Sequence, residues 1–131
     1  MASGLLDTSV VVDLDDEAVR AALPDDVAVS AITLAELAIG PILAASSAEG
    51  ARRQVRLQQI EATFETLPFD VGAARSYAQV VGAAVSSGRS HRRRVANLLI
   101  AATAHANGMA LYTRNPGDLA GLESLIEIVD V

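Results

Sequence analysis

The sequence of 131 residues contains no cysteine and no tryptophan, and all ten of its basic residues are arginine. Without cysteine, the chain has no disulfide framework, no thiolate nucleophile and no zinc–thiolate site. Without lysine, it has neither a P-loop lysine nor a residue for Schiff-base chemistry. Its two histidines, His91 and His105, are too few for an all-histidine metal site. A metal bound to this chain would therefore rest on oxygen ligands.

The chain also lacks an overall positive charge and has few aromatic residues. Acidic residues outnumber basic ones 16 to 10, which gives a net charge of −6, so no general basic field attracts nucleic acid. Aromatic residues make up 3% of the chain, which leaves few platforms on which bases can stack. Any role with nucleic acid must therefore be local and depend on backbone contacts.

Long apolar runs are missing as well. No stretch approaches the roughly 20 apolar residues that a membrane-spanning helix needs, so we expect no membrane partner. The amino terminus shows no signal-peptide pattern, because Asp7 interrupts the first apolar run. We therefore expect a cytoplasmic protein. The length, with 51% hydrophobic and 20% charged residues, predicts a single globular domain over residues 1–131.

Short apolar runs alternate with amphipathic segments along the chain. Turn residues and β-branched runs predict strands ending near residue 7 and at 27–30, 110–112 and 126–129, and a short strand or bend at 67–70. Apolar periodicity predicts helices over 15–23, 33–39, 48–63, 70–86 and 95–106, the last closed by a left-handed Asn107-Gly108 cap. This order favours an α/β fold with a mostly parallel central sheet and helices on its faces.

Polar side chains follow the predicted strands or begin the predicted helices at what would be one edge of the sheet. In open parallel sheets, ligands bind at the carboxyl ends of the strands. Carboxylates gathered there repel one another unless a proton or a divalent cation neutralises them. Mg²⁺ and Mn²⁺ prefer such oxygen ligands, and they can generate a hydroxide and stabilise the leaving oxygen of a phosphodiester. The pattern indicates a metal-dependent nuclease, with these candidate residues: Asp7, Glu36, Asn97, Thr113, Asn115 and Asp118.

Each candidate also has a purely structural interpretation. Asp7 would cap the turn that follows it. Glu36 would be the N3 residue of a capping box whose N-cap is Thr33, three residues earlier. Asn97 would cap a helix that starts one residue later. The two candidates in the turn after strand 110–112 are common turn residues. Each of these residues is weak evidence alone. Their predicted placement at one edge of the sheet is what favours a metal-dependent site.

Four segments resemble, in order, the signature segments of PIN-domain proteins: Leu-Leu-Asp-Thr-Ser at 5–9, Thr-Leu-Ala-Glu-Leu at 33–37, Asn-Leu-Leu-Ile-Ala-Ala-Thr-Ala at 97–104, and Tyr-Thr-Arg-Asn-Pro-Gly-Asp-Leu at 112–119. The size resembles that of a VapC-type toxin from a bacterial toxin–antitoxin pair. The resemblance implies a PIN-like three-layer α/β/α fold and a Mg²⁺- or Mn²⁺-dependent endoribonuclease. It also implies a homodimer, or a toxin–antitoxin hetero-oligomer, held inactive by a cognate VapB-like antitoxin.

The resemblance also assigns roles to individual residues. Asp7 matches the first metal-binding acid and Glu36 the second, while Thr113 matches the polar residue that orients the site. Asn115 and Asp118 both fall in the segment that supplies the fourth acid, and the sequence does not choose between them.

Asn97 departs from the family pattern, which has aspartate before the Leu-Leu-Ile-Ala-Ala run. An amide has nearly the shape of a carboxylate but no charge and one acceptor oxygen, so we expect weaker metal binding. Asn97 is either natural, leaving a weakened nuclease, or an exchange introduced so that a toxic enzyme can be produced. The neighbouring residues keep the family pattern, which favours an introduced exchange.

The alternative function is a decayed PIN-like module that binds RNA or a partner. Phosphotransfer folds also place an aspartate after the first strand, but they need a lysine, and this chain has none. They are therefore less favoured than the nuclease and the binding module.

A dense basic segment lies just before Asn97. Its arginines can contact the phosphates of RNA that approaches an otherwise acidic site, although a solvated loop explains any one of them. They are Arg89, Arg92, Arg93 and Arg94. The many aliphatic residues on short helices predict apolar surface that a second copy or an antitoxin helix would cover. An antitoxin arginine reaching the acidic site would inhibit it.

Overall fold

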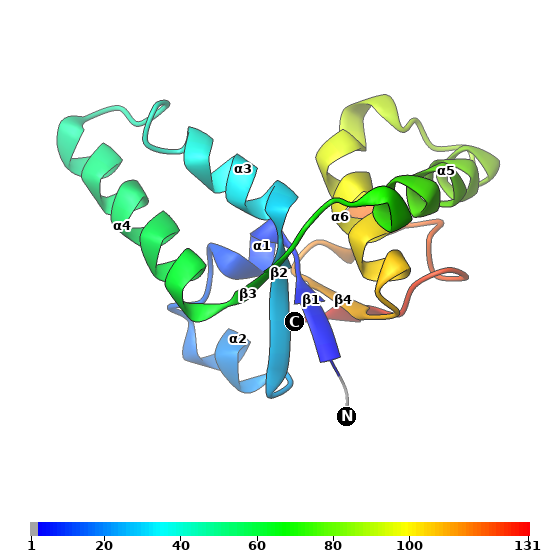
Figure 1. Ribbon diagram of the computed structural model, residues 1–131, viewed down its shortest axis with the longest axis horizontal. Helices are drawn as coiled ribbons and strands as arrows, with labels where there is room; N and C mark the ends of the chain where they lie inside the picture. The colour runs from blue at the N-terminus through cyan, green and yellow to red at the C-terminus, as the bar shows by residue number, and fades with distance from the viewer. Residues whose placement is uncertain (1–2) are drawn as a thin grey trace.

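The computed structural model describes residues 3–131, apart from the side chain of Arg93. Its five strands form one sheet in the order β3-β2-β1-β4-β5, and every neighbouring pair is parallel (Figure 1). The strands are β1 (Ser3–Leu6), β2 (Asp26–Ser30), β3 (Glu65–Leu67), β4 (Ala110–Thr113) and β5 (Ile128–Asp130). The mostly parallel sheet that the sequence predicts is thus entirely parallel within these residues.

The predicted helices are all present, and one short helix was not assigned from the sequence. The α-helices are α1 (Thr8–Val11), α2 (Glu17–Ala21), α3 (Ala31–Ile39), α4 (Ser47–Thr63), α5 (Val71–Ser86) and α6 (Val95–Ala106), and the 3-10 turns are η1 (Arg92–Arg94) and η2 (Pro116–Leu119). The apolar α6 has the predicted bounds. Gly108, at φ 63°, supplies the left-handed residue that ends it.

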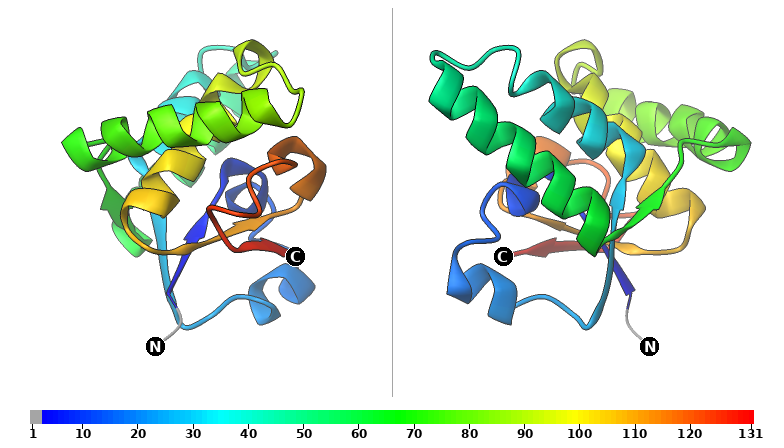
Figure 2. Two further views of the ribbon diagram at one scale, coloured as in Figure 1. Left: turned by 90° about the vertical axis from the view of Figure 1, so that its right-hand side faces the viewer. Right: turned by 60° about the vertical axis from the view of Figure 1, so that its left-hand side comes forward.

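Two apolar cores on opposite faces of the sheet make the three layers. Leu5 joins the core formed with α5 and α6, whereas Leu6 joins the core that contains Val10 of α1, Val19 of α2 and Ile60 of α4. Adjacent strand residues point to opposite faces, so the three central strands β2, β1 and β4 each contribute to both cores. Figure 2 shows the strands lying between α2 on one side and α5 and α6 on the other. Burial of each leucine stabilises the folded state by about 1.5–3 kcal/mol. The two cores therefore hold the strands, and with them the carboxyl edge of the sheet, in place.

The cap of α3 differs from the sequence prediction. Ser30 is the N-cap, and its Oγ accepts a hydrogen bond of 3.1 Å from the Thr33 amide. The predicted cap at Thr33 is wrong because β2 runs directly into α3, so the last strand residue is also the cap. Glu36 lies beyond the first turn and belongs to no capping box. The helix that contains Asn97 likewise begins at Val95, so Asn97 is not its cap.

The sheet reverses its winding direction at β1. The chain continues from β1 to β2 on one side, and it returns as β4 on the other side. In α/β sheets, the crevice outside the carboxyl ends at such a switch point is where ligands bind. Asp7, the residue after β1, lies at this point. Within residues 3–131, no helix has both the length and the apolar character to cross a membrane.

Candidate active site at the carboxyl edge of the sheet

Asp7 is held by β4 and by α1. Its amide donates to the Tyr112 carbonyl of β4 at 3.0 Å, and its carboxylate Oδ1 accepts from Ser9 Oγ at 2.5 Å and from the Val10 amide at 3.3 Å. The side chain therefore caps α1, as the structural interpretation predicts. Asp7 is only 7% exposed, and its Oδ2 has no hydrogen-bond partner among the described residues. Capping thus occupies one carboxylate oxygen and leaves the second for a ligand.

Ser9 connects Asp7 to the end of β4, a role that the sequence analysis missed. Its Oγ accepts from the Arg114 amide at 3.0 Å and lies 3.5 Å from Thr113 Oγ1. Thr113 is fully buried, and its hydroxyl accepts from the Asn115 amide at 3.0 Å. The only sequence signal for Ser9 was a hydroxyl two positions after a candidate acid.

Glu36 is held by two threonines. Thr8 Oγ1 donates to Glu36 Oε1 at 2.5 Å and lies 3.1 Å from Thr33 Oγ1. Because the single Thr8 proton goes to the carboxylate, the Thr33 hydroxyl must donate to Thr8. Thr33 is fully buried and Thr8 is half-buried. The chain of hydroxyls fixes Glu36 against α1 in place of the capping role predicted from its spacing.

The remaining candidates lie on α6 and η2. Asn97 is the third residue of α6 and is half-buried, whereas Asn115 and Asp118 are exposed. α6 packs against both α3 and η2, so these residues share the sheet edge with Glu36. The side chains do not close into one ligand cluster: among residues 3–131, no group of three or more acidic or histidine side chains is placed to hold a metal ion.

The donor chemistry at this edge fits a hard divalent cation. All candidate ligands carry oxygen donors, as Mg²⁺ and Mn²⁺ require. Asn97 supplies a neutral amide oxygen, so the charged donors are Asp7, Glu36 and Asp118. These candidate ligands are therefore all oxygen donors. They carry one negative charge fewer than the PIN-domain pattern, which has an aspartate at the position of Asn97.

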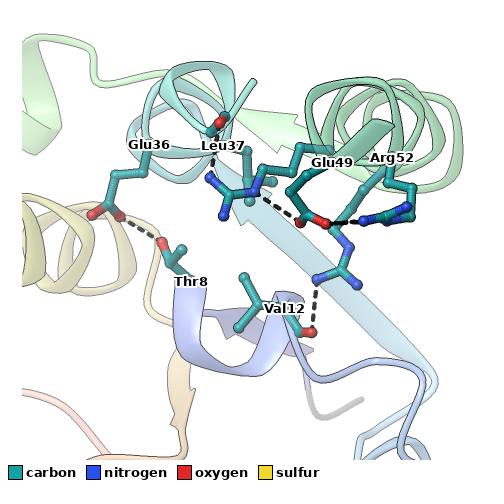
Figure 3. A pocket seen from close by; sticks show the side chains of 9 residues that line it. Thr8, Val12, Glu36, Leu37, Glu49 and Arg52 are labelled. Atoms are coloured by element: carbon teal, nitrogen blue, oxygen red, sulfur yellow. Dashed lines mark hydrogen bonds and ion pairs between the residues drawn. The ribbon is translucent and has the colours of Figure 1, made fainter. Parts of the chain in front are cut away.

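A cleft of about 590 Å³ extends from Thr8 and Glu36 to α4 (Figure 3). Val12 and Leu37 line it with apolar surface, and three arginines of α4 line its far side: Arg52, Arg53 and Arg56. The cleft is therefore acidic at the sheet edge and basic along α4.

The α4 arginines are already partnered. Arg52 and Arg53 form ion pairs with Glu49 at 2.5 and 3.1 Å, and these hydrogen bonds, that of Arg52 first, hold the pKa of Glu49 below its ordinary value. Arg53 also donates to the Gly40 carbonyl at 2.8 Å, and Arg56 donates to the Val12 carbonyl at 2.9 Å. These contacts tie α4 to the α3–α4 connection and to α1.

The basic segment before α6 separates into different environments. Arg89 and Arg92 are exposed, as a phosphate contact requires. The side chain of Arg93 lies outside the described part of the chain. Arg94 turns inward: its Nη1 donates to the Asp118 carbonyl at 2.5 Å, and its Nε and Nη2 are inaccessible to solvent. Arg94 as a whole is half-buried and is engaged with the Asp118 turn, and its contact with RNA phosphate stays a prediction.

Comparison with known proteins agrees with this geometry. The PIN domain profile matches residues 4–120. Ribonuclease VapC5 of Mycobacterium tuberculosis is 37% identical over 99% of the chain and 96% of that relative, and VapC ribonuclease Y4jK of Sinorhizobium fredii is 38% identical over 91% and 93%. The crystal structure of VapBC-5, a member of the VapBC family of toxin–antitoxin systems from M. tuberculosis, superposes with a TM-score of 0.86 and 37% identity over the whole of both chains. The chain belongs to the PIN domain family, among the VapC ribonucleases.

Proposed function

We propose that this protein is the toxin of a type II toxin–antitoxin system and cleaves RNA phosphodiester bonds with Mg²⁺ or Mn²⁺. The observation that carries the proposal is the match over 99% of the chain to a relative named as a VapC ribonuclease. The acidic edge at the switch point of the sheet supports it, because it offers the oxygen donors that this chemistry requires. The proposal covers residues 1–131 as one domain acting in the cytoplasm.

The chain's own residues take distinct roles in this proposal. Asp7, Glu36 and Asp118, with the weaker donor Asn97, would hold the metal. When bound, the metal would activate water and stabilise the leaving oxygen. Ser9 holds one oxygen of Asp7 and Thr8 holds one oxygen of Glu36, so each carboxylate would offer its second oxygen to the metal in a fixed orientation.

Substrate contacts would come from the exposed part of the basic segment. Arg89 and Arg92 are open to solvent just before the first turn of α6. Arginine forms charge-assisted hydrogen bonds with phosphate, so these two side chains would hold the RNA backbone beside the acidic edge. Thr113 would orient the site from the end of β4, where its hydroxyl fixes the Asn115 amide.

A VapB-like antitoxin is the proposed partner. The cleft between Glu36 and α4 is continuous with the site, and Ile42 and Leu43 beyond α3 are 81% and 72% exposed. An amphipathic antitoxin segment would cover this apolar surface and place an arginine against Glu36. The same apolar surface would also serve a homodimer.

A second function, a decayed module that binds RNA or a partner without cleavage, is favoured by Asn97. Together with the absence of a three-acid cluster among residues 3–131, this amide leaves the site short of charge. The experiment that separates the two functions is RNA cleavage with Mg²⁺ or Mn²⁺ by the parent protein, Asn97→Asp and Asp7→Asn. Cleavage that rises in Asn97→Asp and disappears when Asp7→Asn is added supports the nuclease. No cleavage and no Mn²⁺ binding in either the parent or Asn97→Asp supports the binding module.

A further inference from the structure

Arg94 differs from the other arginines of its segment in how its guanidinium is placed. Nη1 donates to the main-chain carbonyl of Asp118 at 2.5 Å. Nε and Nη2 are shielded from solvent and have no hydrogen-bond partner among the described residues. Arg89 and Arg92, by contrast, are exposed. Arg94 is therefore half-buried, with two guanidinium nitrogens shielded from solvent and the third bonded to the Asp118 turn.

Burying a guanidinium without satisfying its donors is unfavourable. A solvent-exposed position is available within the same segment, as Arg92 demonstrates. Two of the three guanidinium nitrogens of Arg94 lose contact with solvent in this inward orientation, so we attribute the orientation to the contact that the third nitrogen makes. Its contact is the carbonyl of Asp118, one of the two candidates for the fourth acidic position, and it makes a charge-assisted hydrogen bond, which is stronger than a neutral one.

The turn that carries Asp118 is anchored at Leu119, which is 2% exposed and packs in the core with α6, but Asp118 itself has few other restraints. η2 is a short 3-10 turn without a side-chain cap, and most of its residues are exposed. Within the turn, the Asp118 amide donates to the Asn115 carbonyl at 3.0 Å. The bond from Arg94 is the one that ties Asp118 to the start of α6, three residues before Asn97.

We infer that Arg94 is a positioning residue that fixes the Asp118 turn against the first turn of α6, and thereby selects Asp118 rather than Asn115 as the fourth ligand. The ligand assignment rests on the proposed function. The restraint on the turn does not, because it can be measured without metal.

If Arg94 is removed, a positioning role and a purely electrostatic role predict opposite changes in metal affinity. A cation near the site repels a divalent metal, so removing it would raise Mn²⁺ affinity if charge alone mattered. Removing a residue that orients a ligand lowers metal affinity by about 10- to 100-fold. Mn²⁺ titration by calorimetry in the Asn97→Asp background therefore separates the two effects.

The decisive variants are Arg94→Met and Arg94→Lys, because lysine and methionine fill similar volumes and only lysine keeps a charge and donors. We expect Arg94→Met to lower Mn²⁺ affinity by about tenfold or more and Arg94→Lys to recover part of the loss. Arg75→Met, which removes an exposed arginine of α5, is the matched control and should leave affinity unchanged. Unchanged or higher affinity in Arg94→Met would overturn the inference, as would an equally deep loss in Arg94→Lys. Replacing Asn115 should cost little, and a loss equal to that of Asp118→Asn would overturn the choice of Asp118.

Amide hydrogen exchange of residues 117–120 without metal tests the restraint separately. We expect exchange to accelerate by about tenfold in Arg94→Met, as loss of a charge-assisted bond implies, and to stay unchanged in Arg75→Met. If no form binds Mn²⁺, the metal step of the proposed function fails, and the exchange result alone decides the role of Arg94. Equal exchange in Arg94→Met and the parent would overturn it.

Discussion

The two halves of the candidate site are stabilised in different ways. In the half formed by α1 and α3, each carboxylate has its own hydroxyl donor, Ser9 for Asp7 and Thr8 for Glu36. In the half formed by α6 and η2, the side chains of Asn97 and Asp118 make no hydrogen bonds with the described residues, and only the Asp118 main chain is tied, by Arg94. The carboxylates of the first half are organised before a ligand arrives. In the second half, α6 and Leu119 are packed in the core, but the side chains of Asn97 and Asp118 have no such donors among the described residues, so their orientation depends on what binds there.

The largest effect is expected when the charge of Asp7 is removed from the half formed by α1 and α3. Asp7→Asn keeps an oxygen that accepts from the Val10 amide, and asparagine caps helices as well as aspartate. We therefore expect an unchanged melting temperature together with a loss of RNA cleavage of about a hundredfold or more in the Asn97→Asp background. Thermal unfolding and a cleavage assay measure both. A large drop in melting temperature would mean that Asp7 serves mainly as a cap.

The next test supplies the charge missing from the other half. Asn97→Asp adds a carboxylate of nearly the same shape in the first turn of α6. We expect Mn²⁺ affinity and cleavage to rise by about tenfold or more, because one additional charge strengthens attraction to a divalent ion. Gln58→Glu, an exposed residue of α4 with the same charge change, should show no gain. An equal gain in both would assign the effect to net charge rather than to position.

A smaller effect is expected from the hydroxyl that holds Glu36. Thr8→Val removes the donor to Oε1 without changing the shape of the side chain. We expect Mn²⁺ affinity to fall by about tenfold, while Thr8→Ser, which keeps the hydroxyl, should stay near the parent. Calorimetric titration of both variants measures the difference. Equal affinities for Thr8→Val and Thr8→Ser would show that Glu36 needs no orienting donor and would weaken the contrast between the two halves.

The smallest effect lies outside both halves, at Glu49 of α4. Arg52 and Arg53 lower its folded-state pKa, so its contribution to stability is present above the ordinary glutamate pKa and is lost as the pH falls through the lowered value. Because Glu49 is exposed to solvent screening, Glu49→Gln should reduce the melting temperature only slightly near neutral pH. The difference should vanish in acid or in high salt, which melting curves at several pH values can check. A difference that persists in acid would contradict an electrostatic origin.

Local patterns predicted most of the fold. Four of the five strands of the described residues, the long helices and the Gly108 cap follow from apolar periodicity and turn residues, which are properties of adjacent positions. The third strand lies at Glu65–Leu67 and meets the predicted strand or bend at 67–70 in one residue. The shared edge of the candidate residues followed from the rule for parallel sheets, and the structure confirms the parallel sheet and the PIN-like fold.

The errors arose where a contact between distant segments decides the outcome. Thr33 and Glu36 have capping-box spacing, but the direct junction of β2 and α3 makes Ser30 the cap. Arg94 is indistinguishable by sequence from the arginines beside it, and only its packing against η2, 24 residues later, turns it inward. Ser9 was missed because its partner, the Arg114 amide, is 105 positions away.

That separation has a consequence for when activity can arise. Ser9 is synthesised near the beginning of translation, and Arg114, the residue after β4 whose amide completes its hydrogen bonds, is added 105 positions later. At a synthesis rate of about 5–20 residues per second, this interval is roughly 5 to 20 s. An unfinished chain that has not reached β4 therefore lacks one wall of the site. For a nuclease that acts on RNA, this dependence would protect the message being translated from its own nascent product.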